Sequence, residues 1–155
     1  MMINTLQGAL VIEMYNNSGS TISKGKAVAY NPTVSNVPWS GPGPDVTKPC
    51  IGITLCTAVE ENFLGVAQAD IPNGTAGPVV IFGRALVNLA ASVSGAAGDT
   101  LAADANGRFA EVTDGTGSIG NALLLVATVT SAGETGTLAW AWVDFRIGGG
   151  MGGAS

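Results

Sequence analysis

The sequence predicts an all-β protein that forms a small antiparallel β-barrel or sandwich. Hydrophobic residues recur at every second position, as near the C-terminus, where Leu138, Trp140 and Trp142 alternate with three smaller residues. A period of two is typical of a strand with two different faces. Glycine makes up 23 of the 155 residues, about twice its usual share. Many short apolar runs divided by such turn-forming residues are typical of a sandwich or barrel.

Runs of β-branched and aromatic residues predict the individual strands, because such residues fit a pleated, partly buried surface. In chain order these runs are Leu10–Tyr15, Ala27–Tyr30, Gly52–Leu55, Val79–Phe82 and Leu138–Val143. A tight hairpin is predicted at Asn106-Gly107, between the runs 100–103 and 108–112, since both turn residues tolerate positive φ. Windows 58–66 and 86–97 compete as helices, but glycine disfavours both. We therefore expect at most one short helix.

The length of the chain favours one domain with a substantial core. Residues 1–15 are predicted to form an N-terminal strand or arm, and residues 16–146 a β-rich domain. Within that domain, residues 31–49 hold five of the seven prolines and predict a long loop, because proline removes a donor from a strand ladder. Residues 147–155 are mostly glycine and predict a flexible C-terminal tail.

The charge balance excludes several classes of function. Six basic and eleven acidic residues give a net charge of −5, which disfavours nucleic-acid binding because phosphate contacts need clustered cations.

The absence of histidine removes Ser-His-Asp triads and His-ligated zinc. No run approaches the ~20 apolar residues of a membrane helix, so we expect no membrane partner. Charged residues make up 11% of the chain, which is below the usual share and indicates a surface largely covered by partners.

No motif predicts catalysis, a cofactor or a metal. Residues 115–120 match a dinucleotide-binding fingerprint, but a strand rather than a helix is expected after them, and too little chain follows. No spacing singles out a pair of carboxylates for acid–base chemistry, and Asp104 is expected to serve a hairpin turn. Cys50 and Cys56 make a poor metal site and are expected to be reduced and mostly buried. We therefore expect a protein that is not an enzyme.

Three tryptophans are candidate contact residues. Trp140 and Trp142 share one face of the last predicted strand. Buried positions, in the core or at a seam between subunits, are favoured for this pair over an exposed platform for a sugar. Trp39 lies alone in the proline-rich loop, where it either anchors a contact with a partner or folds back onto its own domain.

Several segments, in the same order along the chain, resemble those of small phage head decoration, or cement, proteins. The opening segment Asn17–Tyr30 carries the pattern Asn-x-Gly-x-Thr-Ile-x-x-Gly-x-x-Val. The later segments are Ile51–Thr54, Leu64–Ala67, Val79–Leu89, Gly98–Leu101, Asn106–Arg108, Ile119–Leu123 and Ala139–Val143. The proline-rich stretch and the glycine tail are departures from this pattern.

The resemblance implies a barrel or sandwich of jelly-roll or β-tulip-like form with extended termini. It implies a non-enzymatic structural protein, made in the host cytoplasm, that forms a homotrimer on the outer capsid surface of the virion and clamps adjacent major capsid subunits. The terminal segments 1–14 and 147–155 are expected to reach neighbours, for example by adding as strands to their sheet edges. The alternative hypothesis is a fibre or tail module of the virion that binds a host glycan, with Trp39 as the stacking residue.

The candidate interface residues are large apolar side chains at the two ends of the chain together with the three tryptophans. They are Met2, Ile3, Leu6, Trp39, Trp140, Trp142, Ile147 and Met151.

Overall fold

The computed structural model describes residues 8–31, 51–57, 63–90, 97–111, 123–125 and 138–144. These residues form nine strands, and none of them lies in a helix. The strands are β1 (Ala9–Asn16), β2 (Ala27–Tyr30), β3 (Gly52–Leu55), β4 (Phe63–Ala67), β5 (Ala76–Asn88), β6 (Thr100–Ala103), β7 (Phe109–Glu111), β8 (Leu123–Leu125) and β9 (Leu138–Asp144). The all-β prediction is confirmed, and the described part of each helical window is strand or adjoins one.

Five strands form a small closed barrel, in the order β1-β3-β2-β4-β5 with β5 returning to β1. Four of the five pairings are antiparallel, whereas β1 and β3 are parallel. The parallel pair departs from the antiparallel prediction for a geometric reason. In a ring with an odd number of strands, directions cannot alternate all the way round, so one neighbouring pair must run the same way.

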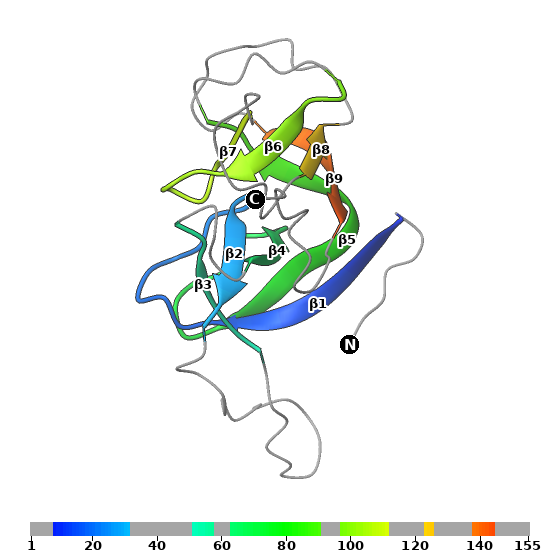
Figure 1. The fold of residues 1–155 in the computed structure, drawn as a ribbon. Helices are drawn as coiled ribbons and strands as arrows, with labels where there is room; N and C mark the ends of the chain where they lie inside the picture. Colours follow the sequence, from blue (N-terminus) through cyan, green and yellow to red (C-terminus); the bar gives the residue numbers. More distant parts are fainter. Residues whose placement is uncertain are drawn as a thin grey trace, which may run out of the picture.

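Strand β5 is longer than the sequence predicts, and its second half leaves the barrel. There it pairs with β9, and the sheet continues through β8 and β6 to β7 (Figure 1). The backbone N–H of Ala90, just past β5, donates to the carbonyl of Phe109 on β7 at 2.8 Å. The second group of strands therefore curls back until its last strand meets the end of β5, and the two halves of the molecule share one strand.

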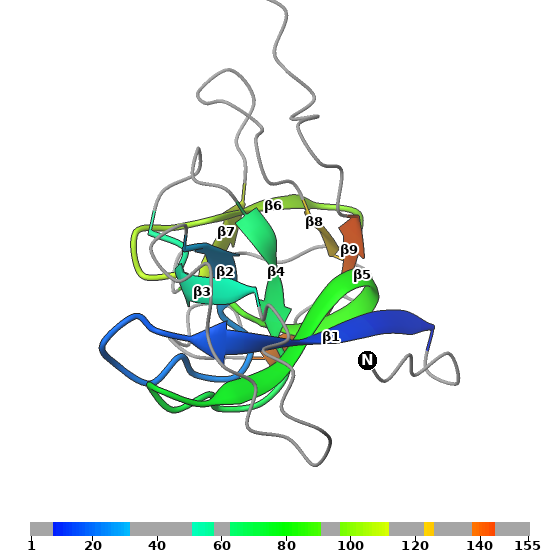
Figure 2. The ribbon, with the colours of Figure 1, turned by 90° about the horizontal axis from the view of Figure 1, so that it is seen from below.

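Gly83 allows β5 to serve both halves. It pairs with Ala9 of β1 on one side and with Val143 of β9 on the other, and β5 curves strongly where β1 lies across it (Figure 2). Its φ is +101°, a region that L-residues with a side chain avoid. A Cβ at this position would overlap the carbonyl oxygen of Gly8 and lie 2.8 Å from the Cα of Ala9.

Two hydrophobic clusters fill the structure. The barrel interior holds Met14, Ile22, Val28, Ile53, Ala67, Ile71 and Val79. The larger cluster lies between the barrel and the sheet that the second half of β5 forms with β6 to β9. It is built around Phe109 from many small side chains of β2, β5, β6 and β9. Phe63 of β4 meets Phe109 edge to face, with 6.4 Å between ring centroids. Cys56 is buried in this cluster, as expected, and Cys50 lies outside the described residues.

Asn16 is the one polar side chain that is fully buried among the described residues. Its Nδ2 donates to the carbonyls of Ser20 at 2.8 Å and Ile71 at 2.7 Å, and its Oδ1 accepts from the N–H of Ser18 at 2.9 Å. Because these bonds satisfy an otherwise costly buried amide, Asn16 ties the turn after β1 to the segment before β5.

We expect Gly83→Ala to lower the free energy of unfolding by about 1–3 kcal/mol more than Gly98→Ala does. Gly98 has nearly the same φ, +100°, so both changes place a side chain in the left-handed region that L-residues avoid. A Cβ at Gly98 meets nothing within 4 Å, whereas one at Gly83 meets backbone. Urea denaturation of both variants measures the difference, and equal losses would show that the contact with β1 does not constrain Gly83.

Candidate functional site

The outward surface of β5 and β9 carries the largest exposed side chains of the described residues. On β9, Leu138, Trp140 and Trp142 are exposed and the residues between them are buried. On β5, Phe82 and Arg84 are exposed on either side of Gly83. We call this surface the β5–β9 face and define it by Leu10, Phe82, Arg84, Leu86, Leu138, Trp140 and Trp142. It is the candidate site of this protein.

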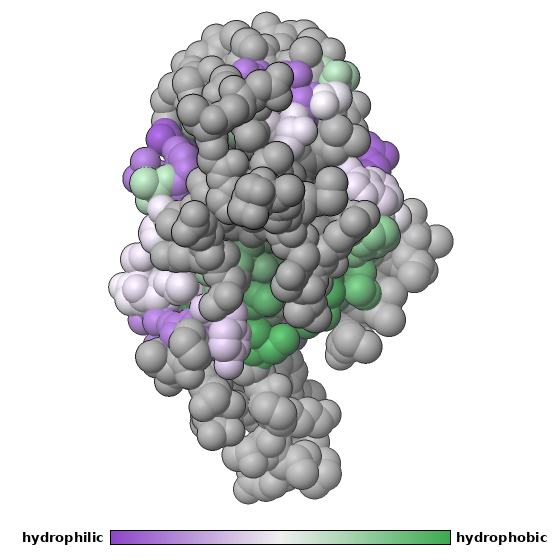
Figure 3. Space-filling model, in the orientation of Figure 1, coloured by the Kyte–Doolittle hydropathy of each residue, from purple (hydrophilic) through white to green (hydrophobic). Residues whose placement is uncertain are grey.

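The register of the strands brings these residues together. Arg84 lies opposite Trp142, Leu86 opposite Trp140, and Phe82 opposite Leu10 of β1. Directly opposed residues of neighbouring strands project from the same side of a sheet. The β5–β9 face is therefore continuous across three strands, and hydrophobic surface lies along β1 and the adjoining part of β5 (Figure 3).

The side chains of the face contact one another in specific geometries. The rings of Phe82 and Trp142 meet edge to face, with centroids 5.4 Å apart and planes at 78°. The guanidinium of Arg84 lies over the ring of Trp140, 4.7 Å from its centroid, close enough for a cation–π interaction. Arg84 is the one charged residue among the described side chains of the face, and by register Asp144, opposite Phe82 at the end of β9, shares this side of the sheet. The face thus presents a fixed cation framed by aromatic rings.

The exposure of Trp140 and Trp142, 40% and 36%, shows that neither ring lies in the core of the chain. The sequence favoured a core or seam position for them, and of these two options the core is wrong. The physical reason is space: the cluster beneath β9 is packed by small residues such as Ala139 and Ala141, which leave no room for an indole. A seam between subunits stays a prediction.

Sequence reasoning missed Phe82 and Arg84. The sequence predicts Phe82 as the last residue of a strand, and its patterns do not single out Phe82 or Arg84 as contact residues. The sequence pattern that could have indicated them is the alternation of Phe82, Arg84 and Leu86 with the small residues Gly83 and Ala85. This alternation has the same period of two as the one in β9.

The other predicted interface residues lie outside the described part of the chain: Met2, Ile3, Leu6, Trp39, Ile147 and Met151. The strands that lead to the terminal ones are described. Ala9 pairs with Gly83, and Asp144 pairs with the adjacent Phe82. β1 therefore begins and β9 ends on either side of β5 at one level, about 10 Å apart for two strand spacings. Residues 9–14 already pair with β5, which corrects the expectation that they add to a neighbour's sheet.

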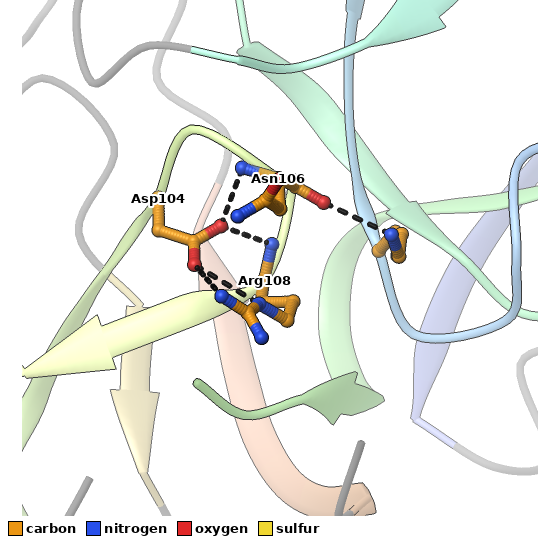
Figure 4. A network of polar contacts seen from close by, with 4 residues as sticks. Asp104, Asn106 and Arg108 are labelled. Carbon is orange, nitrogen blue, oxygen red and sulfur yellow. Dashed lines mark hydrogen bonds and ion pairs between the residues drawn. The ribbon is translucent and has the colours of Figure 1, made fainter. Parts of the chain in front are cut away.

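Asp104 has a structural role in the β6–β7 hairpin, as expected. Its Oδ1 accepts from the N–H groups of Asn106 at 2.7 Å and Arg108 at 2.9 Å, and its Oδ2 pairs with the Arg108 guanidinium at 2.9 Å (Figure 4). The Lys26 ammonium donates to the carbonyl of Asn106 at 3.0 Å and holds the hairpin against the barrel. The carboxylate is thus engaged in shaping a turn.

The described residues provide neither a metal cluster nor a membrane-spanning helix. They contain no group of three or more Cys, Asp or Glu that is placed to hold a metal. They also contain no helix of the length and apolarity needed to cross a membrane. The fingerprint-like residues 115–120 lie outside the described part.

Comparison with known proteins gives matches to one family model and to several solved structures. The model of a phage family described as "Structural cement protein (E217 gp24/Pam3 gp6)" matches residues 2–142. The fold is similar to that of the head fiber gp8.5 N base of bacteriophage phi29, with a TM-score of 0.53, 16% identity, and coverage of 87% of this chain and 95% of that one. No curated protein sequence matches.

We expect Trp140→Ala to lower the free energy of unfolding by about 1–2 kcal/mol, because only a cation–π contact and partial packing are lost. Leu101→Ala, which empties a fully buried position, should cost about 2–5 kcal/mol. Chemical denaturation at low protein concentration, where subunits are apart, compares the two. A larger loss for Trp140→Ala than for Leu101→Ala would place the indole in the core.

Proposed function

This chain belongs to the phage structural cement protein family and is a structural protein of the virion capsid, and from this premise we propose how it acts. It forms a homotrimer on the outer capsid surface and clamps adjacent major capsid subunits without catalysing a reaction. The observation that carries this proposal is the β5–β9 face, because large contiguous aromatic surface on a soluble protein marks an interaction site.

The chemistry of the chain supports a role in adhesion. Aromatic and arginine side chains dominate the binding energy of protein interfaces, and the β5–β9 face combines Phe82, Arg84, Trp140 and Trp142. The net charge of −5 supports the outer surface, because an acidic protein is repelled by the phosphates of the packaged genome. Synthesis in the host cytoplasm is part of the same proposal.

Multivalent contact supplies the mechanism. A trimer offers three copies of each contact surface, so attachment of one subunit raises the effective concentration of the other two at their sites. The overall affinity of the trimer for the capsid then exceeds the affinity of a single contact by a factor of ~10²–10⁴. Capsid subunits bridged in this way separate only when several contacts break together, and the shell resists internal pressure.

A fibre or tail module that binds a host glycan is the second candidate function. The similarity to a head fiber base and the exposed tryptophans favour considering it. The geometry of the face favours it less, since Arg84 covers one side of the Trp140 ring, and a sugar stacks on an open ring face. Binding to a glycan array that is lost in Trp39→Ala would support this candidate.

We expect the purified protein to have a native mass of three times the 15.4 kDa chain and to bind saturably to expanded heads that lack it. Native mass spectrometry and a sedimentation assay with heads of the encoding phage measure the two properties. A monomer that does not bind these heads would contradict the proposal.

We expect deletion of residues 147–155 to leave folding unchanged and to weaken attachment to heads by about tenfold or more, because one of the linked contacts is lost. The deletion removes Ile147 and Met151, which follow Asp144, the residue that pairs with Phe82. Thermal unfolding and the sedimentation assay separate the two effects, and undiminished attachment would show that the tail is not a contact.

A further inference from the structure

We propose that the β5–β9 face binds a surface of the major capsid protein that presents a carboxylate among apolar side chains, and that this carboxylate pairs with Arg84. This inference rests on the proposed function and names the partner chemistry of the same face.

The exposure and orientation of Arg84 suit the binding of a carboxylate from another protein. Its side chain is exposed, and no described carboxylate forms an ion pair with it. The Trp140 ring holds the guanidinium at 4.7 Å, so less conformational freedom is lost when a partner binds. A guanidinium presents a planar fork of donors that matches the two oxygens of a carboxylate. The chemistry that best completes this face is therefore a single anion with two acceptor oxygens.

The aromatic residues around Arg84 strengthen such a pair. Phe82, Trp140 and Trp142 flank the guanidinium on β5 and β9, and apolar groups packed against them would exclude water from the contact. Excluding water lowers the local dielectric and raises the attraction between the two charges. The partner surface must then be apolar around its carboxylate, because an apolar rim is what buries the aromatic rings.

The acidic side chains that the structure describes are already engaged within the chain. Asp70 accepts from the backbone N–H of Lys24 at 2.8 Å, and Asp104 is bound to Arg108. The remaining described carboxylates with placed side chains, Glu13, Asp99 and Glu111, also interact with other groups. Since each of these is engaged within the chain, a second copy offers no unengaged carboxylate from its described side chains.

The test measures binding of the full-length protein to expanded heads of the encoding phage that lack it, at low and high salt. We expect Arg84→Glu to weaken binding by about tenfold or more, as for loss of a hydrogen bond to a charged group. Lys24→Glu makes the same change in net charge at an exposed position that is not among the residues of the face, one residue before Gly25, whose backbone lies beside Leu138. It should bind within about twofold of the parent. The parent's affinity should fall with added salt more steeply than that of Arg84→Gln.

The outcomes separate this inference from the proposed function. If the parent binds heads and Arg84→Glu and Arg84→Gln bind equally well, the inference is wrong and the proposed function stands. If Arg84→Gln loses the native oligomeric mass, the face is a seam between copies and the inference is wrong. If a uronic-acid oligosaccharide displaces the parent from heads but not Arg84→Gln, an acidic glycan is the partner and the inference is overturned. Failure of the parent to bind heads overturns the proposed function itself.

Discussion

The sharing of β5 between two sets of strands is the constraint on which the structure depends. One half of β5 closes the barrel against β1, and the other half starts the sheet that contains β9. The two halves meet at Gly83, where the backbone of β1 approaches too closely for any side chain. Because Phe82 and Arg84 flank this glycine, the same bend that joins the halves also sets the direction in which both side chains point.

The division of β9 into an alanine side and a tryptophan side follows from that arrangement. The space between the barrel and the outer strands is narrow and is filled by small residues, with Phe109 as its largest member. The alanines of β9 fit this space and the tryptophans do not. The bulky residues therefore lie on the outside, where they are exposed to water in the isolated chain. The same packing gives the core its small side chains and the surface its aromatic face.

The sequence was sufficient for the fold class and for local turns. Period-two alternation predicted β9, and Asn106-Gly107 predicted the hairpin that Asp104 stabilises. The closed barrel, the parallel β1–β3 pair and the sharing of β5 were not predicted, because they depend on contacts between residues far apart in the chain. For the same reason the alternation of β9 did not reveal which of its faces is buried. That choice is made by the strands opposite, and it decides whether Trp140 belongs to the core or to the surface.

The pairing of Ala9 with Gly83 has a consequence for biosynthesis. Translation proceeds at about 5–20 residues per second, so β5 leaves the ribosome about 4–15 s after β1. During that interval β1 has neither the strand that completes its ladder nor the residues that close the cylinder around Met14. Long-range closure of this kind is slow. The nascent chain therefore exposes an unpaired strand edge, a surface prone to wrong pairing, until its central strand has emerged.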